Sequence, residues 1–221
     1  IGAHERVRSS LYNCQLLLRP GLQPLIHRKL VPTHGERLIW ARGDGSTLGT
    51  HAAPFGPVGS LICWEHWMPL ARAAMHNQGE VVHIAAWPTV RETYAMASRH
   101  YAFEGRCFVL AAGTIQSRDD VLLGLDHCNL DTTARKAARA LLEAMPEGQL
   151  QFGGSAIIAP DAMVLAQAGS GPETLVADLD LASIGQGLAG LDTDGHYARP
   201  DVFELRVDTR PRDGVVWSDQ G

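Results

Sequence analysis

The segment from Val58 to Ala86 restricts the possible folds more than any other part of the sequence. Val58–Cys63 is a short, mostly apolar run typical of a buried strand, and Val81–Ala86 is a second such run. Between them, Pro69–Asn77 places its apolar residues at helical spacing. A strand, a helix and a strand within about thirty residues predict parallel strands joined by a crossover helix. We therefore expect a layered α/β protein.

Further elements are predicted on both sides of this unit, within a single domain over residues 1–221. Thr33–Pro57 holds five glycines and two prolines without a sustained period, so we expect a long surface loop there. Residues 116–150 are interpreted as an insertion that contains one helix. The remaining predictions are strands at Leu11–Leu18, Leu25–Leu30, Cys107–Ala112 and Leu175–Leu179, helices at Thr93–Glu104 and Thr132–Met145, a hairpin of Ser155–Ile158 with Val164–Gln167, and an extended arm at Gly195–Val207.

Charge and cysteine usage exclude several classes of partner. Lys and Arg number 19 against 24 for Asp and Glu, and the net charge of −5 gives no reason to expect nucleic acid or an anionic membrane surface. The apolar runs are far shorter than the roughly 20 residues that cross a bilayer, and the first residues do not resemble a signal peptide. The four cysteines are widely spaced without a Cys-x-x-Cys pair, which favours a reduced, cytoplasmic protein.

Cys63 is the first candidate for chemistry, because it stands where the first strand of the unit passes into the following turn. Ligand-binding groups of open α/β sheets lie at that end of the strands. A backbone N–H that follows, at Trp64 or Glu65, is placed to bind an oxyanion, and His66 is by its type a candidate base. The alternative is an inert, buried cysteine at the end of an apolar strand.

Two further polar residues are candidates upstream. Lys29, at the end of the Leu25–Leu30 strand, can stabilise negative charge that develops at a reacting carbon, or is simply a solvated lysine. Glu36, in the glycine-rich loop, allows the same two interpretations. The histidines show no spacing typical of a metal site, and Gly43-Asp44-Gly45 lacks the features of a phosphate loop, so we expect neither a metal nor a cofactor.

Seven sequence motifs follow one another in order along the chain. They are HRKLVPT at 27–33 with Glu36-Arg37, LICWEHWMPL at 61–70, Ala86-Trp87-Pro88, RHYAFEG at 99–105, Gly153-Gly154-Ser155 with Pro160-Asp161, ADLD at 177–180, and GHYARPDVF at 195–203. In type and order these motifs resemble those of the nitrilase family of carbon–nitrogen hydrolases. The first, a lysine motif, and the second, a nucleophile motif, carry most of the resemblance.

The resemblance implies a four-layer α-β-β-α sandwich and a homo-oligomer acting on a small nitrile. It assigns Cys63 as the nucleophile, Lys29 as the residue that stabilises the tetrahedral intermediate, and Glu36 as the glutamate that positions Lys29. The Trp64 N–H would bind the polar atom of the intermediate, and Trp87 with Pro88 would line the substrate pocket.

The sequence departs from the family pattern at the general base. The family's base is a glutamate well upstream of the lysine motif, whereas Glu5 is the only acidic residue before Lys29 and its context differs. We therefore expect the base, with the first strands and helices of the fold, to lie outside this chain. Four alternatives to a nitrilase remain at this point: a cyanide hydratase, an amidase-type relative, an inactive scaffold subunit, and a cysteine hydrolase that uses His66 or another histidine as its base.

Overall fold

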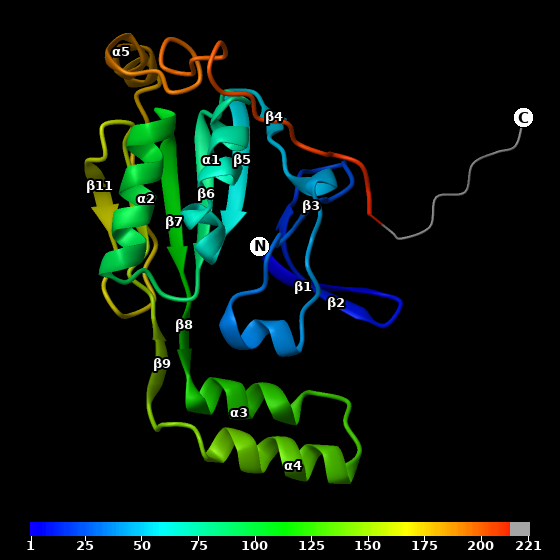
Figure 1. Ribbon diagram of the computed structural model, residues 1–221. Helices are drawn as coiled ribbons and strands as arrows, with labels where there is room; N and C mark the ends of the chain where they lie inside the picture. The colour runs from blue at the N-terminus through cyan, green and yellow to red at the C-terminus, as the bar shows by residue number, and fades with distance from the viewer. Residues whose placement is uncertain (213–221) are drawn as a thin grey trace, which may run out of the picture.

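Three parallel strands form the centre of the computed structural model, which describes residues 1–212 (Figure 1). They are β5 (Gly56–Ile62), β6 (Val82–Trp87) and β7 (Phe108–Gly113), and the register pairs Leu61 with Ala85 and Ala85 with Ala111. Antiparallel strands β4 (His51–Ala53), β10 (Ala156–Ile158) and β11 (Val164–Gln167) complete a sheet of order β11-β10-β7-β6-β5-β4. The predicted parallel unit and the predicted hairpin are thus confirmed.

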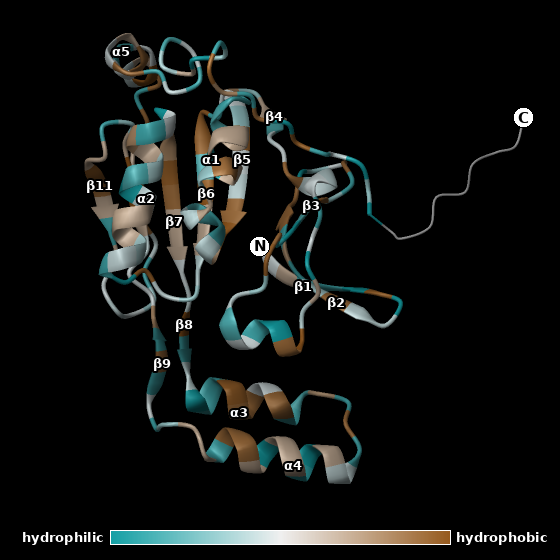
Figure 2. Cartoon of the chain, in the orientation of Figure 1, coloured by the Kyte–Doolittle hydropathy of each residue, from teal (hydrophilic) through white to brown (hydrophobic). Residues whose placement is uncertain are grey.

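Two helices cover one face of this sheet. They are α1 (Pro69–His76), which connects β5 with β6, and α2 (Glu92–Gly105), which connects β6 with β7. Apolar residues concentrate in the central strands, which Figure 2 draws mostly in brown and white. The core beneath the helices includes Leu61, Met75, Ala97, Tyr101 and Val109, all almost completely buried. Burial on both faces of the parallel strands accounts for their nearly continuous apolar sequences.

A second sheet packs against the opposite face. It consists of β1 (Gly2–Val7), β2 (Ser10–Leu17) and β3 (Leu25–Arg28), all antiparallel. Leu16 on β2 lines a small gap together with Val58 on β5 and Ile84 on β6, so the two sheets meet face to face. The arrangement of helices, sheet and sheet confirms an α/β sandwich.

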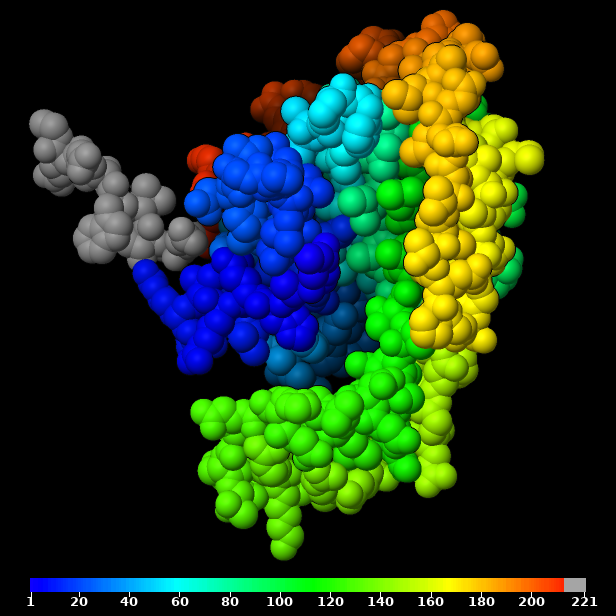
Figure 3. Space-filling view, turned by 180° about the vertical axis from the view of Figure 1, so that it is seen from behind, coloured from blue at the N-terminus to red at the C-terminus, as the bar shows by residue number. Residues whose placement is uncertain are grey.

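A helical hairpin projects from the body of the molecule. Helices α3 (Arg118–Asp126) and α4 (Thr132–Glu143) are carried by a two-stranded ribbon of β8 (Ile115–Ser117) and β9 (Gln149–Phe152). Asp131 caps α4 by accepting the N–H of Ala134. The hairpin stands apart from the sheets in Figures 1 and 3. Its interpretation as an insertion stays a prediction.

Several sequence predictions were wrong in detail. Residues 33–57 are not a plain loop, since they contain the 3₁₀ helices η1 (His34–Leu38) and η2 (Gly45–Thr47) besides β4. Elements of three to five residues are too short to produce a detectable period. Residues 175–179 pair with no strand and instead run along the back of the molecule toward α5 (Ala182–Gly190) (Figure 3). Helix α5 was not predicted from the sequence, because three glycines lie within it and glycine has a low helix propensity.

Candidate active site

Cys63 lies at the carboxyl end of β5, in the turn that leads to α1. It is the first residue of the 3₁₀ helix η3 (Cys63–Trp67), so β5 ends one residue earlier than the predicted strand. Its φ angle of 54° falls in the left-handed region, which costs a residue with a side chain on the order of 1–3 kcal/mol. Neighbouring contacts must therefore hold this peptide in place.

Lys29 follows the last residue of β3, on the other sheet, and is bound by Glu36. The Lys29 side chain is 1% exposed, and its Nζ donates to Oε2 of Glu36 at 2.6 Å. The same oxygen accepts the backbone N–H of Thr33 at 2.6 Å, so η1 presents Glu36 in one orientation. A buried ammonium group needs such a partner, because its desolvation would otherwise be too costly.

The structure brings this ion pair to the thiol of Cys63. Burial raises the pKa of Cys63 above its ordinary value, whereas the charge of Lys29 and the backbone N–H of Trp64 act in the opposite direction. The carboxylates of Glu36 and Glu65 also favour the thiol. Cys63 is thus protonated at neutral pH and requires a base to become a strong nucleophile.

Glu65 turns inward and joins the two sheets. Its Oε2 accepts the N–H of Ile62 at 2.6 Å, and its Oε1 accepts the N–H of Leu30 at 2.7 Å. His27 Nε2 lies 2.9 Å from Oε2, and His27 Nδ1 lies 3.1 Å from the carbonyl oxygen of Thr47. Both ring nitrogens of His27 therefore donate. Burial opposes the charge on His27, but the Glu65 carboxylate outweighs it and raises the pKa of the imidazole.

The other candidates from the motif have different surroundings. Trp64 is half-exposed, and its indole N–H donates to the hydroxyl of Tyr94 at 3.4 Å. Trp87 is buried, with its ring stacked on Tyr94 at 4.6 Å and 6°, whereas Pro88 is exposed. His66 is buried and contacts the backbone of Cys63. Tyr94 was not identified as a candidate from the sequence. The one available signal was its position in a predicted helix that follows the segment containing Trp87.

Glu5 lies on β1 and is occupied by an ion pair. Arg28 donates to both of its carboxylate oxygens, at 2.6 and 2.9 Å. The hydrogen bonds from Arg28 lower the pKa of Glu5 despite its partial burial. Such a carboxylate is a poor base near neutral pH. That the general base lies outside this chain stays a prediction.

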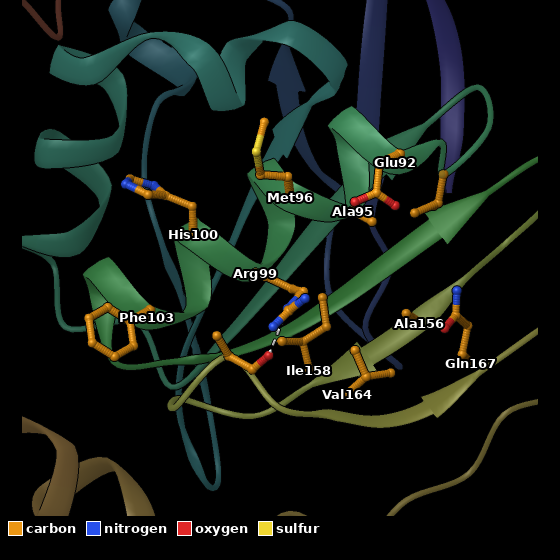
Figure 4. A pocket seen from close by; sticks show the side chains of 12 residues that line it. Glu92, Ala95, Met96, Arg99, His100, Phe103, Ala156, Ile158, Val164 and Gln167 are labelled. Carbon is orange, nitrogen blue, oxygen red and sulfur yellow. Dashed lines mark hydrogen bonds between the residues drawn. The ribbon is translucent and has the colours of Figure 1, made fainter.

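A groove outside the Cys63 region lies between α2 and the β10–β11 hairpin (Figure 4). Its volume is about 440 Å³, and its lining includes Met96, Phe103 and Val164. Arg99 crosses it and donates to the carbonyl oxygen of Ala162 at 3.0 Å. None of the lining residues belongs to the group around Cys63.

Metal sites and membrane spans are both absent from residues 1–212. This range contains no cluster of three or more His, Cys, Asp or Glu side chains placed to hold a metal ion. Over the same residues, every helix is too short or too polar to span a membrane.

The family follows from a comparison of the sequence with models of known protein families. The model described as carbon–nitrogen hydrolase matches residues 1–187. The chain belongs to the carbon–nitrogen hydrolase family. The nucleophile motif and the lysine motif both lie within the matched range, so the resemblance seen in the sequence is confirmed at the level of the family.

Relatives within the carbon–nitrogen hydrolases include several nitrilases. An aliphatic nitrilase of Sinorhizobium fredii is 41% identical over 98% of this chain and 66% of its own length. A nitrilase of Bradyrhizobium diazoefficiens is 40% identical over 97% of the chain and 64% of its own length. A bifunctional nitrilase/nitrile hydratase of Lupinus angustifolius is 38% identical over 87% of the chain and 53% of its own length. The chain thus spans about half to two thirds of these relatives.

Solved structures of carbon–nitrogen hydrolases share the fold. A carbon–nitrogen hydrolase from Helicobacter pylori G27 aligns with a TM-score of 0.65 and 18% identity, covering 86% of this chain and 64% of that one. The C. elegans NitFhit protein aligns with a TM-score of 0.67 and 17% identity, covering 94% and 47%. At such identities the likeness establishes the α/β sandwich alone.

Proposed function

We propose that the chain carries the nucleophile of a nitrilase, which converts a small organic nitrile into a carboxylic acid and ammonia. The observation that supports this proposal is a buried lysine, Lys29, paired with the partly buried Glu36 near the thiol of Cys63. Cys63 would be the nucleophile and Lys29 the group that stabilises negative charge. The nitrilases among the relatives support the choice of substrate class.

The reaction would proceed in two hydrolytic stages. The sulfur of Cys63, deprotonated by a base, bonds to the nitrile carbon, and the nitrogen takes up a proton to give a thioimidate. Water adds to the thioimidate carbon, ammonia leaves, and a thioester remains. A second water displaces the thiol and releases the acid. The Lys29 ammonium and the Trp64 N–H would stabilise negative charge in the tetrahedral species, since both favour the charged form of the Cys63 sulfur. We propose that the base is a glutamate outside this chain.

One branch of this scheme yields an amide. If the tetrahedral species expels the Cys63 thiol instead of ammonia, the product is the amide and the enzyme acts as a nitrile hydratase. The bifunctional relative makes this branch a specific alternative. The product depends on whether the nitrogen or the sulfur of the tetrahedral species is protonated. Neutral ammonia leaves far more readily than NH₂⁻, so protonation of the nitrogen favours the acid.

The test is ammonia release from a panel of aliphatic and aromatic nitriles by the complete polypeptide that contains this chain. We expect Cys63→Ala to lower the rate by more than about 10³-fold, because no other group supplies the nucleophile. Cys128→Ala is the matched control, since Cys128 is an exposed free cysteine far along the chain. Undiminished ammonia release by Cys63→Ala would contradict the proposal.

Product analysis of the same reactions separates the alternatives. Acid with equimolar ammonia supports the nitrilase, and amide alone identifies a hydratase. A polypeptide that forms no covalent adduct at Cys63 with any nitrile would be an inactive scaffold. The predicted homo-oligomer is tested alongside by light scattering of the purified protein.

A further inference from the structure

A chain of buried polar side chains leads away from the backbone of Cys63. His66 Nδ1 lies 2.7 Å from the carbonyl oxygen of Cys63, and His66 Nε2 lies 3.1 Å from Nε2 of His83. His83 Nδ1 lies 2.7 Å from Oε1 of Glu80, whose Oε2 accepts the Tyr101 hydroxyl at 2.5 Å. All four side chains beyond Cys63 are buried, and the last of them, Tyr101, belongs to α2. None of them takes part in the chemistry proposed above.

The partners fix where the protons lie in this chain. A carbonyl oxygen can only accept, so Nδ1 of His66 carries a hydrogen. Burial lowers the pKa of His66 well below its usual range, which keeps the ring neutral and leaves its Nε2 as an acceptor. Nε2 of His83 must then donate to it. Nδ1 of His83 is hydrogen-bonded to Oε1 of Glu80, so the direction of each hydrogen bond from the Cys63 carbonyl to His83 is fixed.

Packing locks the two rings in these orientations. The His66 ring stacks on Trp87, with centroids 4.7 Å apart, and the His83 ring stacks on Tyr101 at 3.8 Å. Both histidines are at most 1% exposed, so neither can turn over without displacing its neighbours. A satisfied, rigid polar network is a means of fixing one backbone geometry.

Glycines leave space for these buried polar side chains. A Cβ on Gly59 of β5 would lie 1.5 Å from Oε1 of Glu80, so any other residue would expel the carboxylate. Gly105 leaves room in the same way for the imidazole of His76, which sits next to Glu80. The absence of a side chain at Gly59 in the sheet therefore makes room for the buried carboxylate of Glu80.

We propose that His66 is a positioning residue that holds the peptide of Cys63 in its left-handed conformation. His83 and Glu80 act through it, by fixing its tautomer and its ring plane. The hydrogen bond to the Cys63 carbonyl compensates the cost of the 54° φ angle. The sulfur is thereby kept beside Lys29. The inference rests on the proposed role of Cys63 as the nucleophile.

Two substitutions at residue 66 separate positioning from simple packing. His66→Asn retains a side-chain N–H near the position of Nδ1, whereas His66→Leu fills similar space without a donor. The readout is the rate of alkylation of Cys63 by iodoacetamide as a function of pH, in a Cys128→Ala background of the complete polypeptide. The charged groups that face this thiol are Lys29, Glu36 and Glu65.

We expect His66→Leu to move the midpoint of the alkylation profile upward by about one pH unit and to slow the reaction at pH 7 about tenfold, because the sulfur moves away from the ammonium group. With a nitrile substrate, kcat should fall about 10²-fold at unchanged KM, the size of effect that misplacement by about 1 Å produces. His66→Asn should remain within about threefold of the wild type in both assays.

A second pair of substitutions, at His83, keeps the test decisive if a variant of His66 fails to fold. His83→Gln keeps a donor toward His66 and should react like the wild type, whereas His83→Leu should slow alkylation about tenfold. Equal alkylation profiles for the Leu and the amide variants would overturn the proposal, even in an active nitrilase. A polypeptide that hydrolyses no nitrile but shows the predicted differences in alkylation would refute the proposed function and retain the positioning role.

Discussion

Replacement of Glu65 by glutamine tests whether one carboxylate joins the two halves of the site. Each oxygen of this carboxylate accepts from a different strand end, Oε1 from the N–H of Leu30 and Oε2 from the N–H of Ile62. An amide has one oxygen and one NH₂ group. In either orientation of the amide introduced by Glu65→Gln, the NH₂ would therefore face one of these two backbone donors, and that strand end loses its acceptor.

The expected cost follows from the buried groups left without partners. A buried backbone N–H without an acceptor costs about 1–3 kcal/mol. The substitution also removes the charge beside His27, whose two ring nitrogens both donate. Loss of one member of a buried ion pair costs about 3–5 kcal/mol in total, a large part of the roughly 5–15 kcal/mol that stabilises a typical domain. We expect Glu65→Gln to lower the free energy of unfolding by about 3–5 kcal/mol.

Urea unfolding of the complete polypeptide, followed by tryptophan fluorescence, measures this loss. Glu92→Gln is the matched control, because it makes the same chemical change at an exposed position in the first turn of α2. The control should change the free energy of unfolding by less than about 1 kcal/mol. If Glu65→Gln costs no more than the control, the carboxylate does not join the sheets and the reasoning is refuted.

Three further predictions concern charge and the projecting hairpin. Lys29→Met keeps the bulk of the side chain without its charge, so alkylation of Cys63 at pH 7 should slow about tenfold, and an unchanged rate would exclude Lys29 from the site. Burial opposes ionisation of Glu104, but hydrogen bonds from a histidine and an arginine on α1 lower its pKa from 4.5 to about 2. Because the native pKa lies below the unfolded one, its contribution of about 1–2 kcal/mol, allowing for partial exposure, is present above about pH 4.5 and lost as the pH falls toward about 2. Urea unfolding of Glu104→Gln and wild type at about pH 6 and about pH 2.5 should show a difference that shrinks, whereas a constant difference would contradict the assignment. Replacement of residues 118–147 by a short Gly-Ser turn should change the free energy of unfolding of the body by less than about 1 kcal/mol and leave alkylation of Cys63 unchanged, whereas a loss above about 3 kcal/mol would make the hairpin part of the core.

The parts of the site that the sequence predicts are those set by local position. Cys63 stands at the end of an apolar strand before a helix, and that position alone brings it to the carboxyl edge of a parallel sheet. Lys29 and Glu36 are seven positions apart, and that spacing does not predict their contact. They were identified by the family motif, because a motif is associated with a known three-dimensional arrangement. The parallel pairing of β5 with β6 was equally predictable, because parallel neighbours need a long crossover connection and the sequence places a helix there.

The polar interior was beyond the reach of the sequence. Nothing in the run Val81–Ala86 indicates that His83 faces His66 rather than solvent, because a histidine in a strand is compatible with either face. Glu65 was a candidate only through its backbone N–H, yet its side chain is 1% exposed and lies inside the molecule. Its partners come from two different sheets, His27 and the N–H of Leu30 from the β3 end and the N–H of Ile62 from β5, and such convergence exists only once the sheets have packed.

The two principal groups of the site come from sheets that share no ladder of hydrogen bonds. Lys29 follows β3 and Cys63 follows β5, so the gap between ammonium and sulfur is set by how the sheets slide on one another. Side chains such as Leu16 and Ile84, which face each other across that interface, therefore act as spacers between Lys29 and Cys63. Apolar substitutions that touch no substrate should therefore change the rate of the catalyst. Hydrostatic pressure, which compresses such an interface, should alter the reactivity of Cys63 before it unfolds the chain.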